Sequence, residues 1–537
     1  MRRAWKSGGA HENWFNVKNL TTNQVYSINF AEVCWSIIQE EVLYSQENDP
    51  EILQAKLTEL EKWKQFNTYT EVSDHGNDAI TTRWVVTEKT IDGIKGYKAR
   101  LVARGFEENT ENVKSDSPTI SKENLRLICN LAVTNNWVIH SIDVTSAFLQ
   151  GLPIERDIYI LPPPEANTSN LWKLNVPVYG LADASRSWYM KVAKELIDTG
   201  AKKSIYDNAL YFWKDSENKL SGFMGSHVDD LLHGGNEQFR NTIIQTLKNR
   251  FAMSAEHEQN FRYLGVEMDQ QPGEISMNQH HYIESLNTIQ LVDNTPGRKL
   301  SRGERRLLKG LIGQLQWVAK QTRPDIAFMT CQLSTRINKA TVKDVKDANK
   351  QVIKLKQEKL TVSIPDTGEY TTTKFVVFSD ASHANLPDNG SQGGFVIFLQ
   401  GSNGKACPLL WVSRKLKRTV KSAMAAETMA FLEAAEHAML LRQLLSEILD
   451  IESANIPIVC CIDSKQVHDA VNSTKTCEDK RNQIDISALR EMIENKEIEA
   501  TRKVSSENNL ADCLTKETAP ADKLMRVISG ATTLNIE

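Results

Sequence analysis

Four short, largely apolar runs in this chain of 537 residues are each followed by aspartate. VIHSI precedes Asp143, FMGSHV precedes Asp229 and Asp230, FVVFS precedes Asp380, and PIVCCI precedes Asp463. Short apolar runs bounded by polar residues are typical of buried strands. A carboxylate at a strand end can point into a cleft, so the pattern predicts acidic sites along the edges of sheets.

The expected elements define the fold class. A chain of this length is too long for one hydrophobic core, so several structural units are expected. Residues 49–66 and 121–134 predict helices with one apolar face, and residues 81–106 read as a two-stranded hairpin. The last 150 residues or so predict three strands, a long helix over 422–449, and then alternating strands and helices that end in a helix over 508–516. The predicted fold class is multidomain α/β and α+β.

Composition excludes several classes of protein. No apolar run approaches the roughly 18 residues that span a bilayer, and the first residues lack the apolar segment of a signal peptide. We therefore expect an intracellular protein without a membrane partner. The eight cysteines include no CxxC pair, which favours reduced thiols over zinc ligation. The net charge of -4 does not indicate nucleic acid binding, but the basic stretches 298–323 and 414–421 could either contact phosphates or face solvent.

Asp143, Asp229 and Asp230 suggest a specific chemistry when they are considered together. Alone, the adjacent pair would be an ordinary acidic turn. Two-metal phosphoryl transfer requires hard oxygen ligands around two Mg²⁺ ions that lie roughly 4 Å apart. Three carboxylates from neighbouring strands would satisfy that requirement. The triplet Asp366-Thr367-Gly368, which also occurs in aspartic proteases, follows a proline and is predicted to be a turn.

The order of several motifs resembles one family. IDVTSAFLQG, PVYGLADASRSWY and HVDD resemble the core motifs of the reverse transcriptase in copia-type LTR retrotransposon Pol polyproteins. ITTRWVVTEK and KARLVARGF are similar to its fingers hairpin, and FRYLGVEM and GLIGQLQWVAKQTRPDIAF to its thumb and connecting region. The resemblance implies a right-hand polymerase followed by an RNase H-like mixed α/β domain. The expected boundaries are 1–50 for an N-terminal spacer, 51–250 for fingers and palm, 251–370 for thumb and connection, 371–520 for the RNase H-like domain, and 521–537 for a C-terminal tail.

The resemblance implies roles for individual residues of the polymerase. It makes Asp143, Asp229 and Asp230 the ligands of two Mg²⁺ ions, which Mn²⁺ could replace. The remaining assignments are Lys98 and Arg100 for the incoming triphosphate, Phe148 for a ring beneath the sugar, and Gly180 for close approach to the template–primer. A basic exposed strand is the alternative for the two cations, and core packing is the alternative for Phe148. His227 replaces the family's usual tyrosine, and Asp183 lies where the family usually has glutamine.

The last part of the chain, including ADCLTK, resembles the RNase H domain of the same elements. Asp380, Glu427, Asp463 and Asp512 become the ligands of two further Mg²⁺ ions, which activate a water and stabilise the leaving 3′ oxygen. We expect Asp512 to open the last helix. The alternatives are a helix cap for Asp512 and a surface charge for Glu427. No histidine is assigned a role, because Gln483 stands where the family often has one.

The implied function is an RNA-directed DNA polymerase with RNase H activity. Its partners would be an RNA template, a DNA or tRNA primer, the RNA–DNA hybrid and dNTPs, with a protease and an integrase upstream in the same polyprotein. The resemblance implies a location in the cytoplasm, within a virus-like particle, with entry to the nucleus. Arg302, Arg305 and Arg306 are predicted to hold the duplex between the two sites. The alternative function is a catalytically inactive remnant that at most binds nucleic acid.

Overall fold

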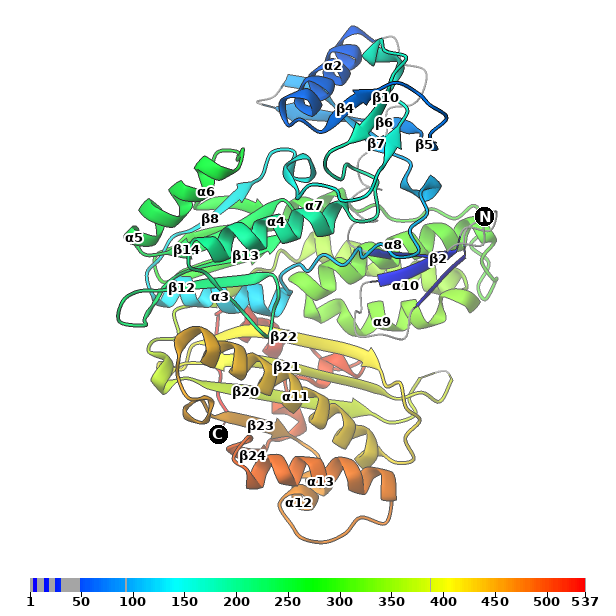
Figure 1. Cartoon of the computed structure of the whole chain (residues 1–537). Coiled ribbons are helices and arrows are strands. Elements are labelled where there is room, and N and C mark those ends of the chain that lie inside the picture. The colour runs from blue at the N-terminus through cyan, green and yellow to red at the C-terminus, as the bar shows by residue number, and fades with distance from the viewer. Residues whose placement is uncertain are drawn as a thin grey trace. The chain divides into compact units, whose positions relative to one another are not determined.

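The computed structural model describes residues 3–6, 14–18, 25–29, 49–91, 94–386 and 388–536 (Figure 1). The chain forms two compact units. The first unit contains residues 1–117 and 146–192, and the second contains residues 118–145 and 193–537. Within the expected spacer, strands β1 (Arg3–Lys6), β2 (Trp14–Lys18) and β3 (Val25–Asn29) pair antiparallel, and the remainder of residues 1–48 lies outside the described residues.

The first unit is built around one helix and a long hairpin. Helix α2 (Pro50–Gln65) begins after Asp49, whose side chain accepts a hydrogen bond from the Glu51 N–H. Strands β6 (Thr82–Ile91) and β7 (Ile94–Ala103) form the hairpin that the sequence predicted. Leu60 and Trp63 of α2 share one buried cluster with Leu101 of β7. A small sheet completes the unit, with the strand order β4 (Tyr69–Val72), β10 (Leu171–Leu174), β9 (Tyr159–Ile160) and β5 (Ala79–Ile80).

A six-stranded sheet carries the first group of acids in the second unit. Its strand order is β11 (Lys202–Lys203), β12 (Leu210–Lys214), β13 (Leu220–His227), β14 (Asp230–Gly235), β8 (Ile139–Asp143) and β15 (His257–Glu258). Helix α3 (Lys122–Thr134) precedes β8, and helix α4 (Ala184–Asp198) contains residues of both units. The stretch 237–250 contains a π-helical turn at Arg240–Ile244 between α5 (Glu237–Phe239) and α6 (Gln245–Arg250).

A second sheet and a group of helices follow. Strands β16 (Asn260–Tyr263), β17 (Val266–Gln271), β18 (Glu274–Asn278) and β19 (Val362–Pro365) pair in this order. The helices are α7 (His280–Ser285), α8 (Arg302–Gln321), α9 (Ala327–Arg336) and α10 (Val342–Gln357). Asp366 accepts a hydrogen bond from the Gly368 N–H at 2.8 Å, and Gly368 has a φ of 76°, so the protease-like triplet forms a turn as predicted.

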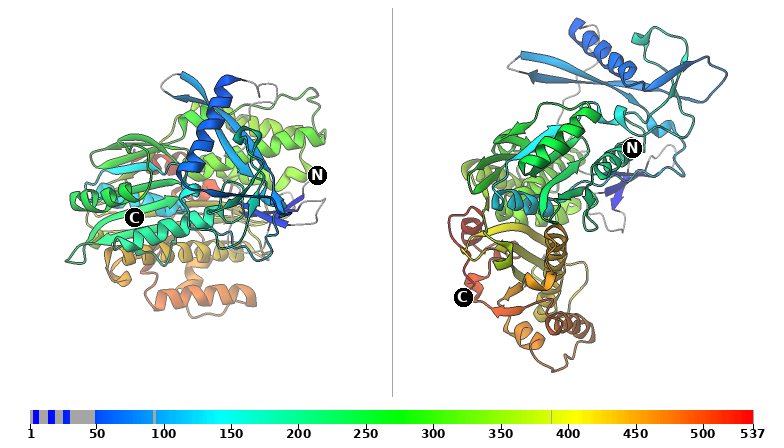
Figure 2. Two further views of the ribbon diagram at one scale, coloured as in Figure 1. Left: turned by 45° about the horizontal axis from the view of Figure 1, so that its top comes forward. Right: turned by 60° about the vertical axis from the view of Figure 1, so that its left-hand side comes forward.

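The last sheet has five strands in the order β22 (Ala406–Lys415), β21 (Gln392–Gln400), β20 (Lys374–Ser382), β23 (Ile458–Ile462) and β24 (Ala500–Lys503). Strands β20, β23 and β24 run parallel, whereas β21 and β22 are antiparallel to their neighbours. Helix α11 (Ala423–Leu449) packs on β20 and β21 (Figure 2), and α12 (Lys465–Val471) and α13 (Lys480–Glu494) follow β23. The predicted order of strands and helices agrees with the structure up to residue 503, except that α12 was not predicted.

Two expectations for the C-terminal part were wrong. The helix predicted over 508–516 is a pair of 3-10 turns at Ser506–Asn508 and Asp512–Leu514. Residues 521–537 do not form a tail, because helix α14 (Asp522–Ile528) packs against β22 and buries Leu524 and Ile528. These apolar side chains complete the core of the sheet.

The six-stranded and five-stranded sheets share one buried core, and helices α7, α8, α9 and α10 bury a separate cluster. A single cluster of buried side chains runs from Leu127 of α3 through Met268 of β17 to Phe378 of β20. It therefore crosses both expected boundaries, at 250 and at 370. No helix among the described residues is long and apolar enough to cross a membrane.

Candidate functional site

A two-residue turn carries the first acidic group. His227 at the end of β13 pairs with Asp230 at the start of β14, so Val228 and Asp229 form the tip of the hairpin. Val228 has a φ of 56°, a left-handed conformation that costs a β-branched residue on the order of 1–3 kcal/mol. The Asp229 carbonyl accepts a hydrogen bond from the Val144 N–H at 2.9 Å, which ties the turn to the chain that follows β8. The hairpin thus stores strain where it presents its acids.

Asp143 and Asp230 are paired in register across β8 and β14. Burial, together with the negative charges of Asp229 and Asp143, raises the pKa of Asp230 to about 7. The Asp143 N–H donates to Ser254 Oγ at 3.1 Å, and the Ser254 N–H donates to the Asp143 carbonyl at 2.8 Å. Three carboxylates that repel one another on a supported backbone are a donor set that fits a divalent cation.

His227 does not add charge to this group, because burial lowers the pKa of its imidazole to about 4. Sequence reasoning missed Tyr263, whose hydroxyl oxygen lies 3.5 Å from the carbonyl oxygens of Gly225 and Asp230. Tyr263 precedes a turn in which Leu264 and Gly265 have φ values of 51° and 69°. The motif FRYLGVEM had marked this region without a role for the tyrosine.

Lys98, Arg100, Phe148 and Gly180 belong to the first unit, whereas the three aspartates belong to the second. Lys98 is exposed and Arg100 half-buried on β7, and they alternate with Ala99 and Leu101, which are buried. The two cations therefore point to the face of the hairpin that does not pack into the core.

Phe148 lies in a 3-10 turn at Ala147–Gln150, half-buried, with its ring centroid 5.1 Å from that of Tyr179. Gly180 has a φ of 96°, and a Cβ there would lie 2.0 Å from the Ala103 carbonyl oxygen. Packing within the unit is thus sufficient to require glycine at position 180, without any close approach of nucleic acid.

Asp183 does not place an uncompensated charge in the first unit. The Arg156 guanidinium donates to both of its carboxylate oxygens, one of them at 3.0 Å, and Arg156 Nε donates to Glu108 at 2.7 Å. Such a fork neutralises the acid that departs from the family pattern.

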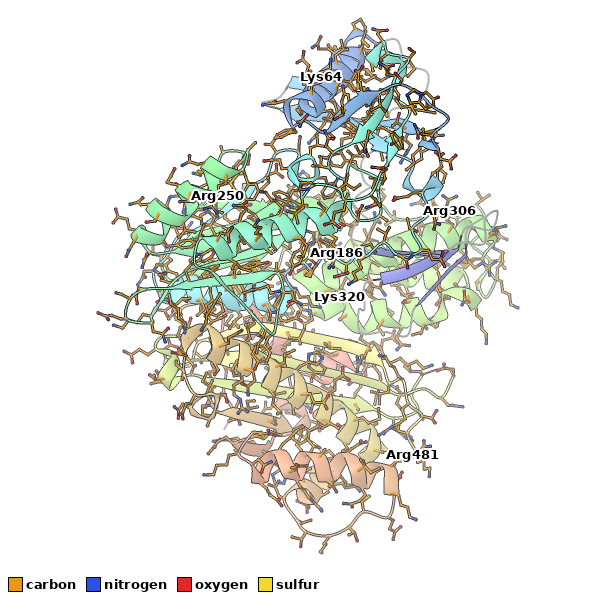
Figure 3. The ribbon with its side chains drawn as sticks, viewed as in Figure 1. Lys64, Arg186, Arg250, Arg306, Lys320 and Arg481 are labelled. Carbon is orange, nitrogen blue, oxygen red and sulfur yellow. The ribbon has the colours of Figure 1, made fainter. Side chains whose placement is uncertain are left out.

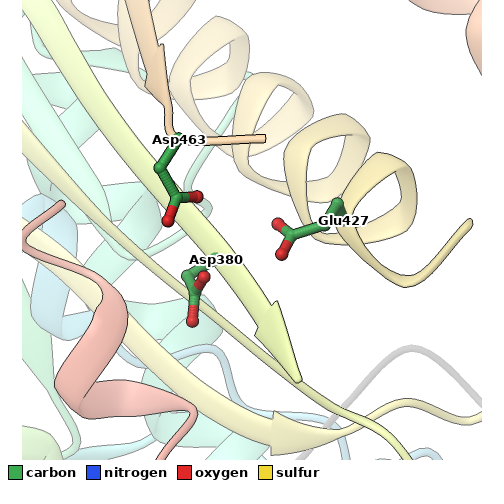
Figure 4. Close-up of side chains that lie close together, drawn as sticks. All are labelled: Asp380, Glu427 and Asp463. Carbon is green, nitrogen blue, oxygen red and sulfur yellow. The ribbon is translucent and has the colours of Figure 1, made fainter. Parts of the chain in front are cut away.

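The second acidic group lies in the five-stranded sheet. Asp380 of β20, Glu427 of α11 and Asp463 after β23 each offer a carboxylate oxygen within 4.8 Å of the others (Figure 4). Among the residues that the structure describes, these three are brought close enough together to share one metal ion. The carboxylate oxygens of Asp143, Asp229 and Asp230 are not gathered within this distance. Asp380 is 1% exposed, and its Oδ1 atom has no hydrogen-bond partner. An orphaned buried oxygen of this kind is suited to a cation.

The charges in this cluster are strongly coupled. Burial, followed by the charges of Asp380 and Asp463, raises the pKa of Glu427 to about 9, and burial also raises the pKa of Asp380. The Ala381 N–H donates to Glu427 at 3.1 Å, and Ser506 Oγ donates to Asp463 at 2.8 Å. The site therefore holds its carboxylates at a high electrostatic cost that a bound dication would offset.

Asp512 joins this cluster through a cation rather than directly. The Lys516 ammonium forms an ion pair with Asp512 and lies 3.5 Å from Asp380 Oδ2. Thr515 Oγ1 donates to Asp380. From the motif ADCLTK, the sequence predicted a role only for Asp512. Thr515 and Lys516 follow Asp512 by three and four residues, and this spacing could have identified them.

The basic stretch 298–323 is not one surface. Arg302, Arg305 and Arg306 are exposed in the first turns of α8; Figure 3 labels Arg306 and, near the other end of this helix, Lys320. Arg323 is instead fully buried and paired with Asp325 at 2.8 Å. In the stretch 414–421, three cations are paired with acids: Arg414 with Glu433, Lys415 with Asp388, and Arg418 with Asp485. Lys417 and Lys421 of this stretch are exposed, as are the three arginines at the start of α8.

Comparisons with known proteins agree with the order of these elements. Residues 66–298 match the family described as reverse transcriptase (RNA-dependent DNA polymerase). The chain is 29% identical over 465 residues to the retrovirus-related Pol polyprotein from transposon RE1 of Arabidopsis thaliana, which covers 81% of this chain and 30% of that protein. It is 26% identical over 527 residues to the corresponding polyprotein from transposon TNT 1-94 of Nicotiana tabacum, which covers 89% of this chain and 38% of that protein. The chain thus spans about a third of the length of these curated relatives.

One solved structure has a related fold. The foamy viral protease-reverse transcriptase dRH, in complex with double-stranded DNA, matches 84% of this chain and 69% of its own chain with a TM-score of 0.50 and 11% identity. At this identity the match concerns the fold alone, and it confirms the predicted fold class. Residues 66–298 thus match the reverse transcriptase family, and most of the chain is similar to the Pol polyproteins of copia-type retrotransposons.

Proposed function

We propose that the chain is an RNA-directed DNA polymerase with RNase H activity, and that each site uses two Mg²⁺ ions. The in-register pairing of Asp143 with Asp230, next to the strained turn that presents Asp229, is the observation that carries the proposal. Its substrates would be an RNA template, a DNA or tRNA primer and dNTPs, and the RNA strand of the resulting hybrid.

In the polymerase site, Asp143, Asp229 and Asp230 would hold the ions. When bound, paired Mg²⁺ ions at either site stabilise the attacking and leaving oxygens of the phosphoryl group. Asp230 must give up its proton for the full negative charge of the group to develop, and its pKa of about 7 keeps that step within reach at neutral pH. Lys98 and Arg100 would bind the triphosphate, and Phe148 would lie beneath the sugar. Gly180 would border the template–primer.

In the nuclease site, Asp380, Glu427, Asp463 and Asp512 would hold the ions. Glu427 keeps its proton at neutral pH in the metal-free protein, because burial and its acidic neighbours disfavour the charged form. Loss of that proton gives the cluster the charge that a dication requires. The sheet fixes Asp380 and Asp463 at adjacent parallel strands, and the backbone N–H of Ala381 orients Glu427.

Two substitutions test the proposal. Asp229→Asn is expected to reduce primer extension on poly(rA)·oligo(dT) by several orders of magnitude and to leave hydrolysis of the RNA in a hybrid intact, because one metal ligand is lost at one site only. Asp380→Asn is expected to have the opposite effect.

Each variant serves as the folding control for the other. Unchanged extension by Asp229→Asn would overturn the polymerase site, and loss of both activities in a folded variant would overturn the two-site arrangement. A wild-type chain that neither extends primers nor cuts hybrids would be a catalytically inactive remnant.

A further inference from the structure

Arg126 of α3 is a buried cation whose hydrogen bonds are made to carbonyl groups. Its side chain is 2% exposed. Nη1 donates to the Leu409 carbonyl at 2.7 Å, and Nη2 donates to the carbonyls of Lys320 at 3.1 Å and Gln321 at 2.7 Å. Burial lowers the pKa of Arg126 to about 10, so the group remains charged at neutral pH. A buried charge without good partners would be strongly destabilising, so these contacts define where α3 can lie.

The charge is stabilised by the end of a helix and by an aromatic ring. Lys320 and Gln321 are the last residues of α8, where unpaired carbonyls form the negative end of the helix dipole. The guanidinium lies 3.9 Å from the ring centroid of Trp411 in β22. Trp411 Nε1 in turn donates to the Ala319 carbonyl of α8 at 2.8 Å. One planar group thus joins three elements that are distant in the sequence.

Asn130, one helical turn after Arg126, adds a second polar contact between α3 and a distant part of the chain. Its side chain is fully buried, and Nδ2 donates to the Pro365 carbonyl of β19 at 2.8 Å. Tyr370 Oη donates to Asn130 Oδ1 at 3.2 Å. Arg126 therefore contacts β22 of the five-stranded sheet, and Asn130 contacts the segment that leads into this sheet.

The contacts of Arg126 connect the two sheets that carry the acidic groups. Helix α3 leads directly into β8, which ends at Asp143, and β22 belongs to the sheet whose strand β20 carries Asp380. We propose that Arg126 is a positioning residue that fixes the spacing between the two acidic groups, and hence the number of nucleotides between the primer terminus and the cut in the RNA. This inference rests on the proposed function of both groups.

The experiment uses the full chain and a hybrid whose primer is blocked by a terminal dideoxynucleotide and held at the polymerase site by the next dNTP. The measured quantity is the distribution of RNA cuts relative to the primer terminus. Arg126→Met is expected to widen this distribution about twofold or more, because three carbonyls and a ring lose their common partner. Primer extension, and cutting of a hybrid without a recessed terminus, should persist. Trp411→Phe keeps an aromatic ring but loses the hydrogen bond to the Ala319 carbonyl. This variant is expected to widen the distribution less than Arg126→Met does.

Arg442→Met is the matched control. Arg442 is 4% exposed and donates to the Glu497 carbonyl at 2.8 Å, but α11 and residue 497 both belong to the nuclease part of the chain. This variant should lose thermal stability and keep the wild-type distribution. An unchanged distribution of cuts in folded Arg126→Met would overturn the inference. If that variant does not fold, an unchanged distribution of cuts in Trp411→Phe would overturn it. Wild-type protein without extension or cutting would instead overturn the proposed function.

Discussion

Asp230 carries a proton that an unfolded chain would release. Its pKa is about 7 in the folded, metal-free protein because of burial and two neighbouring carboxylates, and an unfolded aspartate ionises near pH 3.9. Between these two values the folded state binds more protons than the unfolded state. The contribution of this residue to stability is therefore present at low pH, falls as the pH rises through this window, and is fully lost above about pH 7.

Asp230→Asn is expected to remove this part of the pH dependence. In EDTA, the Tm of the wild type should fall more steeply between about pH 5 and pH 7 than that of the variant, because only the wild type must release this proton. Thermal unfolding followed by circular dichroism measures both slopes. Asp522→Asn, at an exposed position in α14, is the control and should behave as the wild type does. Identical slopes in Asp230→Asn and wild type would show that Asp230 does not hold the proton.

Phe148 is predicted to exclude ribonucleotides. A ring beneath the sugar would collide with a 2′-hydroxyl, so Phe148→Val should raise the use of rNTPs relative to dNTPs by about tenfold or more, with dNTP use largely kept. Competing single-nucleotide incorporations measure this ratio. Half-burial against Tyr179 is also compatible with a purely structural ring. In that case truncation to Ala would cost about 3–5 kcal/mol of stability and leave the sugar preference unchanged.

At the scale of elements, helix α8 has two different ends. Its first turn is fixed by a capping box between Ser301 and Glu304, and its last carbonyls bind Arg126 and Trp411. Its first turns also expose three arginines. Since both ends of the helix are anchored, these cations are held on a rigid support.

Replacing Arg302, Arg305 and Arg306 with alanine is expected to weaken binding of an RNA–DNA hybrid. The slope of log affinity against log salt should become shallower by roughly 0.9 for each phosphate that the protein no longer neutralises. Fluorescence anisotropy at several salt concentrations measures the slope. Lys343, Lys346 and Lys350 of α10 are also exposed, and their triple alanine variant removes the same charge as a control. Equal slopes for the two triple variants would mean that the arginines are only solvated.

Helix α3 shows what the sequence could and could not predict. Its bounds agree with the prediction over 121–134, because apolar residues at helical spacing and the Ser121 cap are local signals. The same pattern predicted one apolar face, and the structure buries Arg126 and Asn130 as well. Their partners are more than 190 residues away in the chain, so no local pattern could reveal them. The acids at strand ends were predictable for the opposite reason, since strand and acid are neighbours in the sequence.

At the scale of the molecule, the expected boundaries at 250 and 370 do not divide the core that the two acidic sheets share, although the helices between these boundaries bury a cluster of their own. Met268 of β17 and Phe378 of β20 share one buried cluster with Leu127 of α3. Similarly, the expected tail at 521–537 overlooked that Leu524 and Ile528 lie at helical spacing. The contact of Lys516 with Asp512 is local, but its contact with Asp380 depends on tertiary structure that the sequence does not encode locally.

The ten consecutive buried residues of α3, Asn124–Val133, have a consequence for how such a sequence can decay as it is copied. Because this helix belongs to the same buried cluster as strands of both acidic sheets, a destabilising substitution in that cluster is expected to lower the folded fraction around both acidic groups. If the chain has the two activities proposed above, misfolding would therefore impair both of them together. Substitutions at the acids themselves, or at their immediate supports, would separate them.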